Sequence, residues 1–280
     1  MFTILKKETL NPTVTRFVVD APAVARKAEA GQFIILRVDE KGERIPLTIA
    51  DFDREKGTVT IIAQVVGGTT EKLNHVPEGG AISDFVGPLG KPSQLDGLKK
   101  VAVIGGGVGC AIALPTAKKL HDLGCEVHSI VGFRNKDLVI LEEDFAACSD
   151  KLSVLTDDGS YGKKGLVTDE LRALIESGEK YDEVIAIGPV IMMKFVCKLT
   201  KEFGIKTVVS MNPIMVDGTG MCGGCRLIVG GKTKFACVDG PEFDGHEVDF
   251  DSAMRSGMRF RPQEQIVRER VCNLFKMEVK

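Results

Sequence analysis

The chain has 280 residues, 44% of them hydrophobic and 27% charged, and its 37 basic and 39 acidic side chains leave a net charge of -2. At about 150 residues per domain, this length suggests two domains with room for a smaller segment. The balanced charge argues against a nucleic-acid binder that relies on bulk positive charge. The most apolar run, residues 101–115, is interrupted by glycines and is shorter than the about 20 residues of a membrane-spanning helix. We therefore expect no membrane span and, because the first residues do not resemble a signal peptide, a cytoplasmic location.

Residues 1–97 have the pattern of strands and turns. Apolar and polar residues alternate over residues 13–19, 32–38 and 58–66, and a short helix is expected from Thr69 to just before Pro77. Short strands separated by Gly, Pro and Asp turns are typical of an antiparallel β-barrel. The sequence therefore predicts a first domain of this type.

Residues 98–211 alternate between buried-type strands and helices. Strands are expected at residues 100–104, 126–131, 152–155, 183–187 and 207–210, and helices at residues 111–123, 166–177 and 190–203. This alternation predicts an α/β domain with a parallel sheet.

Residues 212–280 form a third segment. It contains a loop rich in glycine and cysteine, a probable hairpin at Gly230-Gly231 and a polar helix over residues 262–276. Its arginines, Arg255, Arg259, Arg261, Arg268 and Arg270, suggest either a docking face or an ordinary solvated helix.

The strongest motif is Asp217, Cys222, Cys225 and Cys237, with the spacing D-x4-C-x2-C-x11-C. With cysteine in the first place, this would be the plant-type spacing for a 2Fe-2S cluster. A carboxylate can also bind iron, so Asp217 is the candidate fourth ligand. The alternative is that Asp217 is a turn residue and that the three cysteines bind structural zinc, perhaps with His246.

A second motif, residues 103–111, combines a strand, a glycine turn and the start of a helix. This arrangement points backbone N–H groups at a pyrophosphate. The match to G-x-G-x-x-G is imperfect, because Cys110 stands in the third place. The next strand ends at Gly132 and Arg134 rather than at an acidic residue, so the choice between NAD and NADP stays open. Tight packing of strand against helix is the alternative explanation of the glycines.

A third motif lies in the expected barrel. Arg44, Pro46 and Thr48 precede the run from Gln64 to Thr70, which ends in glycines and threonines at a helix start. An arginine, a hydroxyl and helix N-terminal amides can bind a flavin dinucleotide, although each is also common strand-edge and capping chemistry.

These three motifs, in this order, resemble the ferredoxin-NADP reductase-like superfamily, and within it the family of dihydroorotate dehydrogenase B electron-transfer subunits and their relatives. The resemblance spans nearly the whole chain and implies an oxidoreductase subunit with bound FAD, a 2Fe-2S cluster and NAD(H). It places Thr48 near flavin N5 as the candidate catalytic residue. It implies that FAD is bound by Arg44, Pro46, Leu47, Thr48, Val66, Gly67, Gly68, Thr69 and Thr70. It assigns the nicotinamide nucleotide to Gly106, Gly107, Val108, Gly109, Gly132, Arg134, Asp157, Asp158, Gly188, Pro189 and Met192.

The ligand pattern of this loop, with Asp217 in place of the first cysteine, resembles that of the small subunit of the electron-bifurcating NADH-dependent ferredoxin:NADP oxidoreductase. By that resemblance the chain binds NAD(H) and forms a heterodimer with a larger flavin and iron-sulfur subunit, through which ferredoxin is reached. The alternatives are the electron-transfer subunit of dihydroorotate dehydrogenase, or of a sulfide dehydrogenase or sulfur reductase. An alternative of another class is a zinc-stapled nucleotide-binding module without redox activity.

Overall fold

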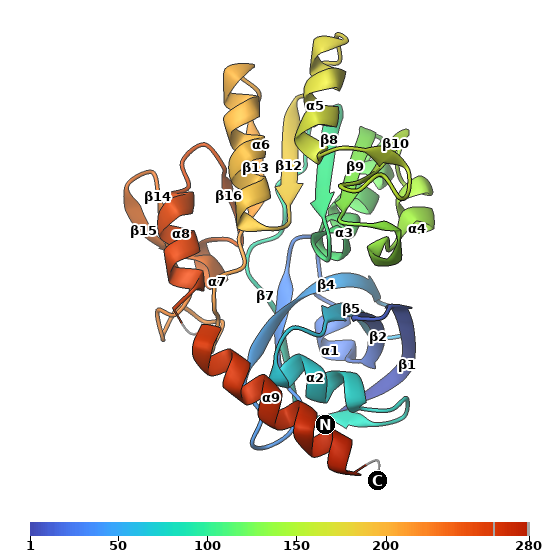
Figure 1. Ribbon diagram of the computed structural model, residues 1–280, viewed down its shortest axis with the longest axis vertical. Helices are drawn as coiled ribbons and strands as arrows, with labels where there is room; N and C mark the ends of the chain where they lie inside the picture. The colour runs from blue at the N-terminus through green and yellow to red at the C-terminus, as the bar shows by residue number, and fades with distance from the viewer. Residues whose placement is uncertain (260, 279–280) are drawn as a thin grey trace.

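The computed structural model describes residues 1–259 and 261–278, and in the last helix it describes the side chains of residues 262–269 and 271. A curled sheet with the N-terminus forms one end of the molecule, and a layered α/β unit forms the other (Figure 1). The third segment lies beside both. Within the described residues, no helix is long and apolar enough to cross a membrane.

The first sheet has seven antiparallel strands in the order β6-β1-β2-β5-β4-β3-β7. The strands are β1 (Phe2–Asn11), β2 (Val14–Asp20), β3 (Phe33–Arg37), β4 (Ile45–Asp53), β5 (Thr58–Gln64), β6 (Ala81–Ile82) and β7 (Asp84–Leu89), with helices α1 (Pro22–Ala25) and α2 (Gly68–His75). The alternation in β2 buries Phe17 and Val19 in a core that also contains Ile34 and Ile61. One face of each strand therefore forms the barrel interior.

The second sheet also has seven strands, in the order β11-β10-β9-β8-β12-β13-β16. Its strands β8 (Lys100–Gly106), β9 (Glu126–Phe133), β10 (Lys151–Thr156), β11 (Lys163–Lys164), β12 (Glu183–Ile187) and β13 (Thr207–Ser210) pair in parallel. The connections contain α3 (Gly109–Asp122), the 3-10 helix η1 (Lys136–Leu138), α4 (Glu142–Ala146), α5 (Val167–Glu176) and α6 (Val190–Glu202). Every residue of β12 is buried, because helices cover both faces of this sheet.

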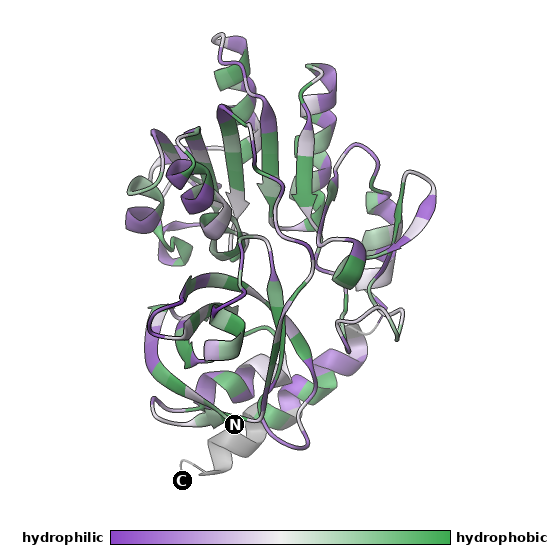
Figure 2. Ribbon diagram, turned by 180° about the vertical axis from the view of Figure 1, so that it is seen from behind, coloured by the Kyte–Doolittle hydropathy of each residue, from purple (hydrophilic) through white to green (hydrophobic). Residues whose placement is uncertain are grey.

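The strands of the second sheet are the most continuously hydrophobic part of the ribbon, whereas the helices show polar residues on their outer sides (Figure 2). This contrast is the pattern that identified the α/β unit in the sequence.

The third segment contains the hairpin β14 (Arg226–Val229) and β15 (Lys232–Phe235), helix α7 (Ala236–Asp239), strand β16 (Glu242–Asp244), and helices α8 (Phe250–Gly257) and α9 (Arg261–Glu278). The hairpin turns at Gly230 and Gly231, whose φ angles of 57° and 71° require glycine. Strand β16 pairs antiparallel with β13 at the edge of the second sheet.

The three-part fold class predicted from the sequence is confirmed. The domain limits stay a prediction: the first sheet ends at Leu89, the second begins at Lys100, and β16 from the third segment completes the second sheet. The pairing of β16 was not predicted, because three residues carry too little periodicity to indicate a strand.

Candidate functional site

The loop with the predicted cluster ligands depends on glycine for its shape. Gly218, Gly220 and Gly223 have φ angles of 77°, 85° and 66°, a region that residues with a Cβ rarely adopt. Two of the neighbouring cysteine sulfurs lie near backbone amides. The amide of Gly224 donates to Cys222 Sγ, and the amide of Cys237 donates to Cys225 Sγ, each at 3.5 Å. Amides directed at sulfur are the surroundings that tune an iron-sulfur cluster.

The four predicted ligands lie in two pairs. Cys225 and Cys237 are buried, with their sulfurs 3.2 Å apart. The Asp217 carboxylate accepts hydrogen bonds from the amides of Thr219, at 3.0 Å, and Cys222, at 2.8 Å. These bonds lower the pKa of Asp217, the Thr219 amide having the largest effect. Asp217 therefore closes a turn, as the simpler interpretation expected, and this turn holds its charged carboxylate beside Cys222.

This donor set fits a two-iron cluster better than a single zinc ion. A tetrahedral zinc ion would bring its thiolates to about 3.8 Å of one another, yet no three of these four residues place ligand atoms within 4.8 Å of one another. His246, the further zinc candidate, has its Nε2 3.0 Å from Thr200 Oγ1 instead. Burial raises the pKa of the Cys237 thiol, so a thiolate there needs a positive charge beside it, which either metal would supply.

The predicted nucleotide residues gather at one edge of the second sheet. The parallel register places the carboxyl ends of β8, β9, β10 and β12 side by side, and such an edge is where α/β sheets bind ligands. The amide of Gly107 donates to Gly132 O at 2.8 Å. The backbone amide of Asp158 donates a hydrogen bond to Arg134 O at 3.3 Å, and that of Asp157 donates to Phe133 O at 2.9 Å.

The glycines of this edge have different reasons to be glycine. A Cβ on Gly109 would lie 2.5 Å from Ile187 O, and one on Gly106 would lie 2.4 Å from Met192 Sδ and 3.0 Å from Pro189 Cδ. Gly107 has a φ of 56° and open space around it. The packing explanation therefore applies to Gly106 and Gly109, whereas Gly107 is explained by its positive φ and has no atom within 4 Å of its Cβ position. The loop from Gly188 to Met192 meets Gly106. Its role beside the nicotinamide stays a prediction.

The predicted flavin residues lie on β4 and at the start of α2. Thr48 pairs with Phe33 and Pro46 with Ile35 across β3 and β4. At the start of α2, the hydroxyl of Thr70 accepts from the amides of Val66 and Gly67, each at 3.0 Å. The first-turn amides that follow have no partner within the helix, so they are available to an anionic ligand.

Arg44 makes a contact that was not foreseen. Its Nε donates to Val216 O at 2.9 Å, and its Nη1 lies 3.7 Å from Asp84. In addition, a Cβ on Gly218 would lie 2.6 Å from Leu89 Cδ1, so the cluster loop packs directly on the barrel. The loop with Asp217 therefore lies against the barrel at β7 and at Arg44, the residue before β4. Whether Arg44 also contacts a flavin phosphate stays a prediction.

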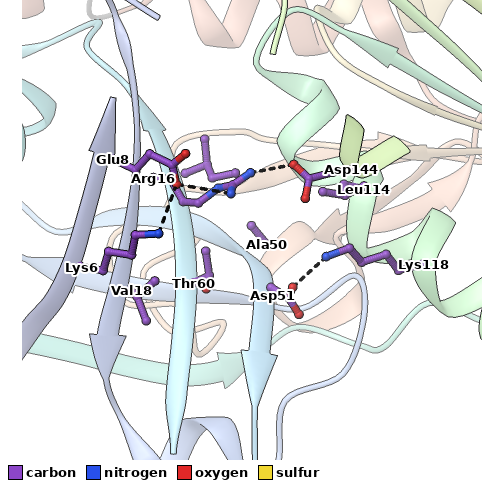
Figure 3. A pocket seen from close by; sticks show the side chains of 11 residues that line it. Lys6, Glu8, Arg16, Val18, Ala50, Asp51, Thr60, Leu114, Lys118 and Asp144 are labelled. Atoms are coloured by element: carbon purple, nitrogen blue, oxygen red, sulfur yellow. Dashed lines mark hydrogen bonds and ion pairs between the residues drawn. The ribbon is translucent and has the colours of Figure 1, made fainter. Parts of the chain in front are cut away.

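A cavity of about 170 Å³ lies elsewhere, between the barrel and helices α3 and α4 (Figure 3). Its charged residues are already paired: Arg16 lies 2.8 Å from Asp144, and Lys118 lies 2.8 Å from Asp51. Lys6 and Arg16 both approach Glu8, at 3.9 and 3.5 Å. The cavity is therefore a seam joined by ion pairs, away from the predicted cofactor residues.

The sequence did not predict two sites with titratable side chains. Glu126, His128 and Glu179 could together hold a metal ion, but Lys100 Nζ lies 2.8 Å from Glu126 and serves as their cation. The other is Glu242, which accepts a hydrogen bond of 2.7 Å from Ser93 where β16 meets the barrel. Neither forms a motif in the sequence, because Lys100 and Glu179 are distant from Glu126 and His128, and Ser93 is distant from Glu242.

Comparison with known proteins identifies the relatives of this chain. The model of the iron-sulfur cluster binding domain of dihydroorotate dehydrogenase B matches residues 212–249. A Thermotoga maritima protein, described as a homolog of the dihydroorotate dehydrogenase B (NAD(+)) electron transfer subunit, is 48% identical over 267 residues, which cover 95% of this chain and 94% of that one. The corresponding Streptococcus mutans subunit is 33% identical over 261 residues, 89% of this chain and 97% of its own.

The chain belongs to the family of dihydroorotate dehydrogenase B electron-transfer subunits. A solved structure of NADH-dependent reduced ferredoxin-NADP oxidoreductase, studied for flavin-based electron bifurcation, superposes with a TM-score of 0.91 at 47% identity and covers 96% of this chain and 97% of its own. Phthalate dioxygenase reductase shares the fold, with a TM-score of 0.61 at 16% identity over 81% of this chain and 85% of its own. The predicted family, and the prediction of a flavin and iron-sulfur oxidoreductase component, are confirmed. The expected cofactors agree with this family.

Proposed function

We propose that the chain exchanges hydride with NAD(H) at a bound FAD and passes single electrons through a 2Fe-2S cluster to a larger partner subunit. The contact of the cluster loop with the barrel, beside the predicted flavin residue Arg44, is the observation that supports this most directly. Arg44, the residue before β4, bonds Val216 O, and a Cβ on Gly218 would lie 2.6 Å from Leu89 Cδ1 on β7 and 3.0 Å from Ile35 Cγ1 on β3. The proposed flavin and cluster sites are therefore in neighbouring parts of the molecule.

A nicotinamide transfers a hydride, a cluster accepts one electron at a time, and a flavin converts between the two. The residues of the chain position these groups. In this proposal Gly107 and the amides at the start of α3 receive the pyrophosphate, and Arg134, Asp157 and Asp158 approach the adenosine ribose. Thr48 on β4 would contact the reactive part of the flavin. Asp217, Cys222, Cys225 and Cys237 would hold the two-iron cluster.

We propose that the partner docks on the outer side of the cluster loop. Large apolar side chains are exposed there: Met221 is 87% exposed and Val216 48%, and Ile214 and Val238 are also exposed. Cys222, between Met221 and the loop glycines, is exposed as well. An apolar surface around an electron-transfer group suits a protein interface.

The identity of the partner separates the two redox versions of this proposal. The likeness to the NADH-dependent ferredoxin-NADP oxidoreductase structure favours a heterodimer with a larger flavin and iron-sulfur subunit, with ferredoxin reduced or oxidised there. The names of the curated relatives favour dihydroorotate dehydrogenase as the partner. Copurification of the complex from the source cells, followed by sequencing of the partner, distinguishes these versions. The same experiment would identify a sulfide dehydrogenase or sulfur reductase as the partner.

Anaerobic purification tests the redox function itself. We expect a coloured protein with flavin and iron-sulfur absorption, two irons and acid-labile sulfide per chain, and bleaching by NADH in preference to NADPH. Cys237→Ser should lose the iron, whereas Cys197→Ser, at a buried cysteine outside the loop, should keep it. A colourless protein that contains zinc and no sulfide would support the zinc-stapled module instead.

A further inference from the structure

Helix α9 leaves the third segment and runs across the barrel to α2 (Figure 1). The two helices meet at Gly68, the first residue of α2. A Cβ on Gly68 would lie 2.9 Å from Val267 Cγ1 and 3.2 Å from Val271 Cγ2. Gly68 is therefore glycine because α9 lies against it, a reason that the motif does not reveal.

Apolar side chains of α9, those of Val267 and Val271, make the contact with Gly68. Val271 is 8% exposed and Val267, at the edge of the contact, is 37% exposed, whereas Ile266 is 52% exposed and Arg268 is also exposed. Gln265 and Glu269 bond each other at 3.2 Å on the exposed surface. The side chains of Arg261 and Arg270, expected as part of a basic docking face, lie outside the described residues. Among the described side chains of α9, Val271 is the buried one, and it lies at the contact with Gly68.

The contact lies beside the turn proposed for the flavin phosphates. Gly67 precedes Gly68, and its Cβ position has open space around it. Gly68 and Thr69 are buried, and Thr69 Oγ1 donates to Glu43 Oε2 at 3.1 Å. The start of α2 is thus closed on the side of Gly68 by α9 and open on the side of Gly67.

We propose that Val267 and Val271 are positioning residues for the flavin: by packing on Gly68 they hold the first turn of α2 in the conformation that binds the FAD pyrophosphate, and so slow the release of FAD. This inference rests on the proposed function of the α2 turn. Val267 and Val271 act through Gly68, although Val267 lies 199 positions after Gly68 in the sequence.

A matched pair of variants in the full-length holoprotein tests the proposal. Val271→Asp puts a charge into the contact, and Ile266→Asp puts the same charge on the exposed side of α9. A charged side chain opposes burial in an apolar contact, so the contact of α9 with Gly68 should open in Val271→Asp. We expect FAD release, followed by the recovery of free-flavin fluorescence after dilution, to be at least about tenfold faster in Val271→Asp and unchanged in Ile266→Asp.

Further measurements separate positioning from general damage. The electron paramagnetic resonance signal of the reduced cluster should be the same in both variants, while the visible circular dichroism of the bound flavin changes in Val271→Asp. Val271→Ile, which keeps an apolar side chain, should restore slow release. If Val271→Asp fails to fold, Gly68→Ala replaces it: the added Cβ should displace α9 and speed release, and Gly68→Ala with Val267→Ala should reverse this.

The outcomes that overturn the proposal are distinct from a failure of the proposed function. Unchanged release in Val271→Asp or in Gly68→Ala shows that α9 does not position the turn. Slower release shows that α9 competes with FAD for the start of α2. A wild-type protein that binds no FAD at all refutes the proposed function itself, before any variant is made.

Discussion

Asp217 is the residue at which this chain departs from a four-cysteine cluster loop. In the structure its carboxylate is held by the amides of Thr219 and Cys222, at the position where the first thiolate would stand. The two amide bonds explain why a carboxylate is stable in this turn, and they leave oxygen lone pairs for a metal.

We predict that Asp217→Cys alters the electronic state of the cluster. A thiolate in place of a carboxylate changes the ligand set of one iron, so both the electron paramagnetic resonance signal and the midpoint potential should shift while the iron content is kept. Met221→Cys, which adds a thiol on an exposed position of the same loop, is the control and should leave both unchanged. An unchanged signal in Asp217→Cys would remove Asp217 from the ligands.

Glu242 is one residue whose titration makes the stability depend on pH. Burial raises the pKa of its carboxyl group to about 7, and the charge of Glu183 adds to this, whereas the hydrogen bond from Ser93 lowers the pKa. Because the folded state holds the proton more tightly than the unfolded state, the stabilisation is complete below about pH 4.5 and is lost as the pH rises through 7.

We predict that Glu242→Gln removes this dependence. The glutamine keeps an acceptor for Ser93 and has no charge to bury, so the variant should be more stable than the wild type at pH 8. A pKa difference between 4.5 and about 7 corresponds to at most about 3 kcal/mol. Urea unfolding at pH 5 and pH 8 measures it, with Glu247→Gln at an exposed position as the control. Equal stability of wild type and Glu242→Gln at pH 8 would contradict the prediction.

At the scale of elements, the junction of β8, α3 and β12 decides how the nucleotide edge is built. Gly109 begins α3 so close to β12 that a Cβ would lie 2.5 Å from Ile187 O and 2.6 Å from Gly188 Cα. Both contacts are with backbone, which cannot rotate away. The first turn of α3 can therefore approach the sheet only because residue 109 lacks a side chain.

We predict that Gly109→Ala destabilises the protein. Displacing α3 from β12 should cost about 1–3 kcal/mol, as overpacking of a core does. Gly257→Ala is a matched control, because Gly257 is also helical and its Cβ position has open space, and it should be neutral or slightly stabilising. Guanidinium unfolding of both variants provides the measurement. A loss of NADH binding without a loss of stability in Gly109→Ala would show that Gly109 serves the ligand rather than the packing.

At the scale of the whole molecule, ion pairs across the seam join the barrel to the α/β unit. Arg16 on β2 pairs with Asp144 on α4, and Lys118 on α3 pairs with Asp51 on β4 (Figure 3). Each pair is partly exposed, so each contributes about 0.2–1 kcal/mol. Their position suggests that they fix the orientation of the two units more than they stabilise either one.

We predict that Asp144→Lys, which places two cations opposite each other, lowers the melting temperature, and that adding Arg16→Asp to it restores the pair and most of the loss. Calorimetry of the single and double variants at low salt gives the coupling energy, which should be about 0.5–1 kcal/mol and should shrink in high salt. If the double variant is no more stable than the single one, the two residues do not act as a pair.

The sequence by itself determined the order of the three segments and the cluster loop. Both depend on short-range signals: strand and helix periodicity, and the spacing of three cysteines and Asp217 within about twenty residues of chain. The helix over residues 262–276 was likewise predicted close to the observed α9.

Only the tertiary structure decided what these parts contact. Arg44 and Val216 are 172 positions apart, and Gly68 meets α9 from the opposite end of the chain. The same glycine pattern contains Gly107, required by its backbone conformation, and Gly106 and Gly109, required by packing. A motif shows that a side chain is missing at a position. What occupies the space is set by contacts between distant segments, which local propensity and spacing do not encode.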